Sequence, residues 1–91
     1  MSLRVVSGEP TADGTEFRVI FESDSREELL DGEVLRHAIK IAADAGFGLN
    51  CAITNVGNPY PVDETGKPIT FMPAQNTRML FRRTVSCAPR I

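Results

Sequence analysis

The stretch 25–46, SREELLDGEVLRHAIKIAADAG, decides the fold because it carries the clearest helical pattern in the chain. Its apolar residues recur at intervals of three or four, the spacing that places side chains on one face of a helix. The stripe consists of Leu30, Val34, Ala38, Ile41 and Ala45. Gly46 follows where a left-handed residue commonly ends a helix. The pattern predicts one amphipathic helix that buries a single face against another layer.

The start of this helix has two alternatives. Ser25 followed by Glu28 fits a capping box, in which the hydroxyl accepts from the amide of Glu28 and the carboxylate returns to the amide of Ser25. Asp31-Gly32 then interrupts the pattern, and an interior glycine costs about 1 kcal/mol relative to alanine. The helix therefore begins at Ser25, or at Asp31 with residues 25–30 forming a separate turn. Acidic residues crowd this end and favour the positive end of the helix dipole.

β-strand patterns flank the helix on both sides. Residues 3–7 and 16–22 lie around Asp13-Gly14 and predict a hairpin with a bulged or four-residue loop. Residues 49–54 predict a third strand, which a crossover through the helix could place parallel to the second. Two later segments complete the sheet, a hairpin at 60–72 whose two prolines favour a sheet edge and a last strand at 78–87.

The predicted fold is α+β, with a single helix packed on one face of a curved, mainly antiparallel sheet of about five strands. The order is β-hairpin, helix, then three or four strands, and residues 1–91 form a single domain. The chain is 42% hydrophobic and 24% charged, which is typical of globular proteins. Its apolar runs are too short to span a bilayer, so we expect no membrane association and a cytoplasmic location.

Composition also argues against several kinds of site. The chain has two cysteines without C-x-x-C spacing and one histidine, which argues against a structural zinc site. We expect Cys51 and Cys87 to be buried and reduced. A net charge of −2 argues against a general nucleic-acid binder. No motif identifies a family, and no catalytic residue, metal or cofactor is assigned.

Charge is divided unevenly along the chain. Residues 1–64 hold all twelve acidic side chains and five basic ones, a balance of −7, whereas residues 65–91 hold five basic side chains and no acid. Separated fields of opposite sign steer association with a partner or between copies of one chain.

The basic half gives the strongest functional signal. Arg78 and Arg82 share one face of the last predicted strand, with Cα atoms about 13 Å apart, and Arg83 points to the other face. Three interpretations stay open. The arginines protect an exposed strand edge, they contact a protein, or they bind an anionic small molecule or nucleic acid.

The first functional hypothesis is a small non-enzymatic interaction or accessory module that self-associates, as a dimer, or binds a protein partner. Arg78 and Arg82 form the basic half of its contact. The acidic half is the cluster at the start of the helix, composed of Glu27, Glu28 and Asp31. Tyr60 lies between two prolines and is a rigid amphipathic anchor of the kind enriched at interfaces.

The alternative is an anion-binding protein or a small enzyme. Its pocket lies between helix and sheet, where Arg83 points inward and His37 lies on the edge of the helix stripe. An inward arginine is costly unless a carboxylate or ligand meets it. The absence of an orienting partner for His37 in the local sequence favours the non-enzymatic hypothesis.

Overall fold

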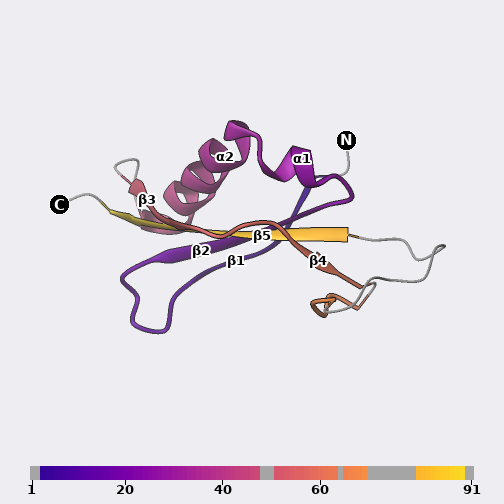
Figure 1. Ribbon diagram of the computed structural model, residues 1–91. Coiled ribbons are helices and arrows are strands. Elements are labelled where there is room, and N and C mark those ends of the chain that lie inside the picture. The colour runs from indigo at the N-terminus through magenta and orange to yellow at the C-terminus, as the bar shows by residue number, and fades with distance from the viewer. Residues whose placement is uncertain (1–2, 48–50, 64, 70–79, 90–91) are drawn as a thin grey trace, which may run out of the picture.

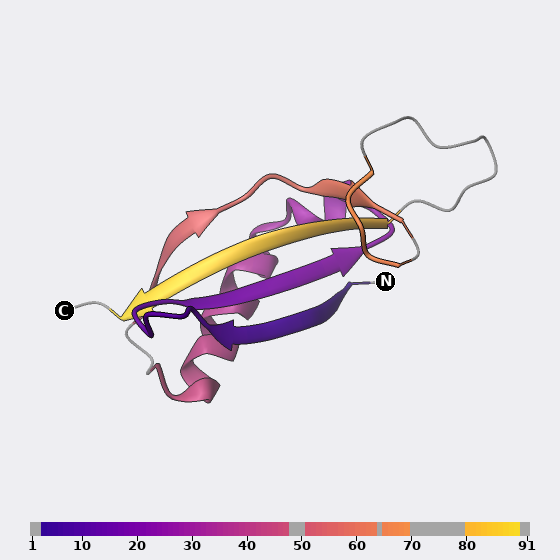
Figure 2. The same cartoon turned by 90° about the horizontal axis from the view of Figure 1, so that it is seen from below.

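The computed structural model describes residues 3–47, 51–63, 65–69 and 80–89. In these residues one five-stranded sheet carries the helices on one face, the helix face, and leaves the other, the open face, without a helix (Figures 1 and 2). The elements in chain order are β1 (Arg4–Pro10), β2 (Phe17–Ser23), α1 (Arg26–Leu29), α2 (Gly32–Ala42), the π-helical turn η1 (Ala43–Phe47), β3 (Cys51–Val56), β4 (Tyr60–Val62) and β5 (Leu80–Pro89). The predicted α+β class is confirmed.

The strands follow the order β1-β2-β5-β3, and β4 pairs with β5 as well. Every pairing is antiparallel. Because β2 and β3 both run antiparallel to β5, they run parallel to each other with β5 between them. The last strand is therefore central, and the interpretation of its arginines as protection for an exposed edge is wrong. Partners occupy both sides of β5, a long-range pairing that no local pattern reveals.

The register of β2 against β5 sorts side chains onto the two faces. It runs from Phe17 opposite Cys87 to Ser23 opposite Phe81. Alternate residues of β2, namely Phe17, Val19 and Phe21, are buried on the helix face. The residues between them, Arg18, Ile20 and Glu22, lie on the open face. As predicted, Arg82 and Arg83 lie on opposite faces, opposite Glu22 and Phe21 respectively.

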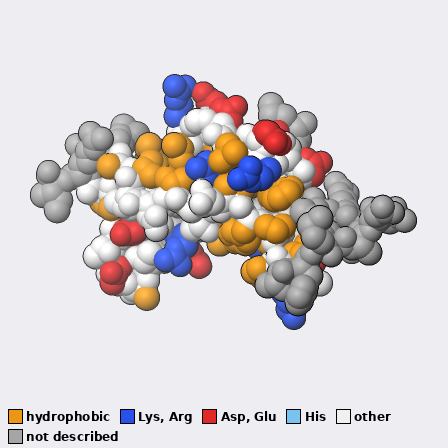
Figure 3. Space-filling view, in the orientation of Figure 1, with side chains coloured by type: hydrophobic (Ala, Val, Ile, Leu, Met, Phe, Trp, Pro, Cys, Tyr) orange, Lys and Arg blue, Asp and Glu red, His pale blue; other side chains and the backbone are white. Residues whose placement is uncertain are grey.

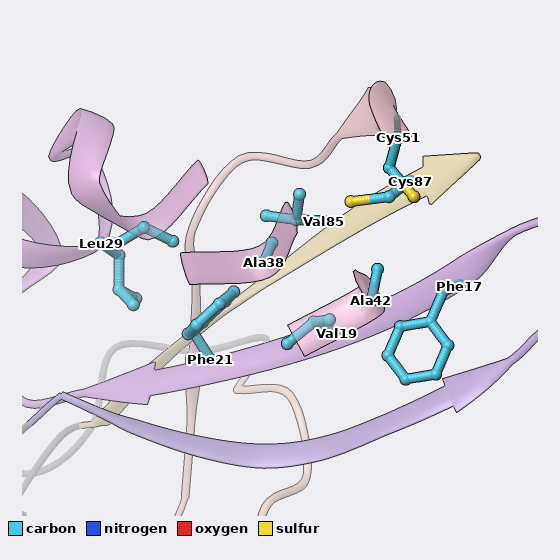
Figure 4. Close-up of a cluster of buried hydrophobic side chains, with 10 residues drawn as sticks. Phe17, Val19, Phe21, Leu29, Ala38, Ala42, Cys51, Val85 and Cys87 are labelled. Atoms are coloured by element: carbon cyan, nitrogen blue, oxygen red, sulfur yellow. The ribbon is translucent and has the colours of Figure 1, made fainter. Parts of the chain in front are cut away.

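The core lies between the sheet and α2 (Figure 4). The small residues Ala38 and Ala42 let the helix approach the sheet closely, and both are fully buried. Phe17 and Phe47 close one end of the core, with ring centroids 5.4 Å apart. The buried apolar residues of this cluster are Phe17, Val19, Phe21, Leu29, Val34, Ala38, Ala42, Cys51, Val85 and Cys87, and Val62 of β4 is buried as well.

The helical region contains both predicted starts. Ser25 caps α1 by accepting from the amide of Glu28 at 3.4 Å, and Asp31 caps α2 by accepting from the amide of Glu33 at 3.0 Å. The returning half of the capping box is wrong. The Glu28 carboxylate instead accepts from the Ser23 hydroxyl at 2.8 Å, and that hydroxyl also accepts from the amide of Ser25 at 3.0 Å. Ser23, at the end of β2, thus bonds both the Glu28 carboxylate and the Ser25 amide, which the capping-box motif would have joined to each other.

Both tight turns rest on an aspartate and a glycine with positive φ. The β1–β2 connection is six residues long, and the amide of Thr11 bonds the carbonyl of Glu16 at 2.9 Å. Within it, Asp13 precedes Gly14, whose φ is 73°. Asp63 and Gly66 form the corresponding turn after β4, where Val62 bridges Pro68. Residues 70–72 of the predicted second hairpin lie outside the described residues.

The helices of the described segments are short. None of them combines the length and the apolar character that crossing a bilayer requires.

Candidate interaction surface

A row of four residues crosses the open face, one from each of four strands. The pairing registers set Arg4 of β1 opposite Glu22 of β2, Glu22 opposite Arg82 of β5, and Arg82 opposite Tyr60 of β4. Arg82 and Tyr60, which the sequence assigns to one contact surface, are thereby neighbours on adjacent strands. Arg4 and Glu22 belong to the acidic half of the chain and carry no local sequence signal that marks them as part of a surface.

Glu22 is the centre of this row. Its Oε1 accepts from Arg4, with Nε at 2.8 Å and Nη2 at 2.6 Å, and its Oε2 accepts from Arg82 Nε at 2.9 Å. Glu22 is only 4% exposed. Burial alone raises its pKa, but the hydrogen bonds and charges of Arg82 and Arg4 outweigh burial and hold the pKa below its ordinary value. The carboxylate is therefore ionised at neutral pH and satisfied within the chain.

The two arginines differ in how much of each remains available. The side chain of Arg82 is 21% exposed, and its guanidinium lies against the backbone of Gly66, in the turn after β4. The side chain of Arg4 is 66% exposed, at the edge of the sheet. Two guanidinium groups meet one carboxylate, which leaves one positive charge in excess. The excess positive charge is accessible to a partner at Arg4 of β1, and much less so at Arg82 of β5.

Strand β1 forms one edge of the sheet, and no described residue pairs with its outer side (Figure 2). Val5 on this strand is 41% exposed, which is unusual for a large apolar side chain in the described part of the protein. A bulge between Val5 and Ser7 shifts the register against β2. An unpaired edge of this kind exposes backbone N–H and C=O groups that can bind another strand.

The arginine of the alternative hypothesis, Arg83, faces inward as predicted. Its Nη1 donates to the carbonyl of Leu29 at 2.6 Å, and its Nε donates to the carbonyl of Gly57 at 2.9 Å. The guanidinium thus holds the end of α1 and the β3–β4 connection to β5. Both partners of the guanidinium are backbone carbonyl oxygens, whereas the sequence suggested a carboxylate or a ligand.

His37 lies on the exposed side of α2, with its ring edge-on to Phe21 at a centroid distance of 6.1 Å. Phe21 and Leu29 are fully buried between helix and sheet, in the region that the alternative hypothesis gives to a pocket. An open hollow of about 350 Å³ lies elsewhere, along the β1–β2 turn between Thr11 and Arg18.

The acidic cluster lies on the other side of the sheet from Arg82. Glu27 and Asp31 are exposed beside the helices, and acidic side chains lie over the helix layer in Figure 3. Asp31 serves as a helix cap, and Glu28 accepts from Ser23. The structure therefore does not place this cluster and Arg82 on one surface. Arg78, the other predicted basic residue, lies outside the described residues.

The aspartates of the two turns are held by their own loops. Hydrogen bonds from Thr11 and Thr15 lower the pKa of Asp13 to about 2. The carboxylate of Asp63 accepts from the hydroxyl of Thr65 at 2.6 Å and from the amide of Lys67 at 3.0 Å, and its pKa is lowered as well. Both carboxylates stabilise turns that also contain a glycine with positive φ.

Cys51 and Cys87 are buried, as expected, and form no disulfide; they lie on neighbouring strands of the helix face (Figure 4). Burial, with a smaller contribution from the neighbouring Cys51, raises the pKa of Cys87. A raised pKa keeps the thiol protonated at neutral pH, and a protonated thiol is a poor nucleophile. Cys87 therefore packs as a small apolar side chain, and the thiol of Cys51 donates to the carbonyl of Phe47 at 3.4 Å.

The described residues contain no group of three or more histidine, cysteine, aspartate or glutamate side chains placed to hold a metal ion. Comparison with family models, with curated proteins and with solved structures found no match to this chain. The arrangement of the residues themselves is therefore the basis for any function.

Proposed function

We propose that the protein is a small non-enzymatic interaction module that self-associates as a dimer, and that β1 is its contact strand. The observation that carries the proposal is the outer edge of β1, which no described residue covers. Strand addition at such an edge is a common mode of protein association, because the main-chain hydrogen bonds of the sheet continue into the partner.

The contact proposed from the sequence thus moves from β5 to β1. Strand β5 is central, and Arg82 already binds Glu22. Part of the charge division between the two halves of the chain is neutralised inside the molecule by this pair. The excess positive charge of the row lies at Arg4, which is available to a partner.

The sheet has a second edge at β3, but its side chains favour it less. A register shift interrupts the pairing of both edge strands, but no residue of Cys51–Val56 is charged. Strand β1 carries Arg4 and Glu9 near its two ends. Charges of both signs on one edge suit association between identical copies, since each copy supplies what the other needs.

The proposed location is the cytoplasm. Two buried thiols on neighbouring strands that form no disulfide suit a reducing compartment, in which thiols persist. Burial keeps both side chains within the core, where neither contributes to the proposed contact.

Sedimentation velocity over a series of protein concentrations tests the proposal. We expect a monomer–dimer equilibrium whose dimer fraction rises with concentration and falls as salt is added, because charge pairs at an exposed edge are screened. A monomer at every concentration and ionic strength would remove self-association as the function.

A further inference from the structure

We infer that two copies pair β1 to β1, antiparallel about a two-fold axis, with Arg4 of each copy opposite Glu9 of the other. The inference rests on the proposed function and adds to it the symmetry, the register and the residues of the contact. In this register Val5 lies opposite Gly8 of the partner copy, and Val6 opposite Ser7. The two sheets become one continuous sheet through the shared edge.

The faces agree in this register. The pairing of β1 with β2 sets Arg4 opposite Glu22 and Glu9 opposite Arg18, which places Arg4 and Glu9 on the open face. Val5 pairs with Phe21 and Gly8 with Val19, so Val5 and Gly8 lie on the helix face. The Arg4–Glu9 and Val5–Gly8 pairs therefore each join residues of the same face, as two strands of one sheet require, and Val6 lies in the bulge between them.

The charges agree as well. Arg4 is 66% exposed at its side chain and belongs to a group with two guanidiniums and one carboxylate. Glu9 of the partner copy supplies the second carboxylate. The two-fold axis makes this contact twice, and each copy contributes one charge of either sign. Opposite charges directly across a pair of strands stabilise the pairing, whereas like charges destabilise it.

Apolar contact adds to the match. Val5 projects from the edge as a 41% exposed apolar side chain. Gly8 is exposed on the same strand, and a β-carbon there would lie 3.3 Å from the ring of Phe17 and 3.5 Å from the γ-methyl of Ile41. These two side chains leave little room for a larger residue at position 8, which accounts for the glycine in β1. Val5 of the partner copy, placed opposite Gly8, lies beside the same apolar atoms.

Other registers lose these agreements. A shift by one residue brings side chains of the open face against those of the helix face. A shift that sets Arg4 opposite Ser7 loses the Arg4–Glu9 contact between copies, and Glu9 then faces only Arg18 of its own chain. A parallel arrangement in register brings Arg4 against Arg4, and like charges repel. Pro10, which has no N–H to donate, limits the pairing to the segment from Arg4 to Glu9.

A charge-swap mixture tests the register. The Glu9→Arg variant carries arginine at both positions 4 and 9, and the Arg4→Glu variant carries glutamate at both. We expect each variant alone to lose self-affinity by about tenfold or more, since like charges then face each other twice. An equimolar mixture should recover the dimer as a heterodimer, because every proposed pair is again Arg with Glu. Sedimentation velocity of the variants and of their mixture measures this.

Arg4→Glu removes a partner of the buried Glu22 and so can impair folding. Variants at residues that do not contact Glu22 therefore test the contact independently. Val5→Lys should abolish the dimer, whereas Leu30→Lys, at a 46% exposed apolar residue beside the helices, should leave it unchanged. Glu27→Arg makes the same charge change as Glu9→Arg but at the acidic cluster, and should not weaken the dimer.

These arms separate the two claims. If the wild-type chain dimerises but Val5→Lys and Glu9→Arg dimerise equally well, the β1 register is wrong while self-association stands. Loss of the dimer in Glu27→Arg alone assigns the contact to the acidic cluster, and likewise overturns the register. A wild-type chain that is always monomeric removes both.

Discussion

Glu22 of β2 and Arg82 of β5 lie directly opposite each other in the sheet, although sixty residues separate them in the sequence, and a hydrogen bond of 2.9 Å joins them. Their pairing brings the acidic half of the chain against the basic half within one molecule. Arg4 binds the same carboxylate from β1, so one buried acid links three adjacent strands. The stability of the sheet should therefore depend on this group in ways that can be measured.

Removal of Arg82 tests the buried pair. Arg82→Ala leaves a carboxylate that is 4% exposed with one partner fewer, and should lower the free energy of unfolding by about 2 kcal/mol. Arg36→Ala is the matched control, because its pair with Glu33 is exposed on both sides, and should cost less than about 0.5 kcal/mol. Urea unfolding measures both. Equal costs for the two variants would contradict the role assigned to Glu22.

Acid should weaken this contribution. The pKa of folded Glu22 is below its ordinary value of 4.5, so the group stabilises the fold fully above that pH and ceases to do so as pH falls through the folded-state pKa. The stability difference between wild type and Glu22→Gln should therefore be largest near neutral pH and shrink under acid. Thermal unfolding from pH 7 to pH 3 measures it. A difference that stays constant over this range would show that Glu22 does not titrate as described.

Local patterns predicted much of the fold, and long-range pairing accounts for what they missed. Asp31-Gly32, Gly46 and the middle of the amphipathic stripe encode the helix and its ends within a few residues of sequence. The predicted burial of Leu30 and Ala45 is wrong, because both are exposed and lie outside α2. The position of β5 between β2 and β3 depends on contacts across tens of residues, so its alternating pattern alone did not separate a central strand from an edge. The partner of Glu28 was missed for the same reason, because Ser23 approaches from the end of β2.

Three glycines should respond differently to substitution by alanine. Gly66 has a φ of 89°, and a β-carbon there would lie 2.8 Å from Nη2 of Arg82, so Gly66→Ala should cost about 1–2 kcal/mol. Gly14 also has a positive φ but open space around it, so Gly14→Ala should lower the free energy of unfolding by less. Gly32 lies in the first turn of α2, and Gly32→Ala should raise the free energy of unfolding by about 0.5 kcal/mol. Denaturant unfolding of the three variants tests this order, and Gly66→Ala as the mildest change would contradict it.

Arg83 should behave as a structural residue. Arg83→Met keeps an apolar stem but leaves the carbonyls of Leu29 and Gly57 without their donor, which should cost about 1–3 kcal/mol. Phosphate should shift the melting temperatures of wild type and variant equally, since backbone oxygens already occupy the guanidinium. Stabilisation of the wild type alone by phosphate would instead support the anion-binding alternative.

The candidate surface was less predictable than the fold. The alternation of 78–87 placed Arg82 and Arg83 on opposite faces, and the structure confirms this. Glu22 and Arg4 carried no local signal, since an acid after Phe21 and an arginine near the start of the chain are ordinary in an exposed strand. Only the registers of two strand pairs show that both meet Arg82.

Amide hydrogen exchange at two protein concentrations tests the central claim most directly, because pairing at β1 protects backbone N–H groups that a lone edge strand leaves exposed to water. We predict that amides within Arg4–Pro10 exchange more slowly in concentrated than in dilute protein, while those of Cys51–Val56 exchange at the same rate in both. Exchange from β1 that is independent of concentration, in a sample that contains dimers, would contradict the account.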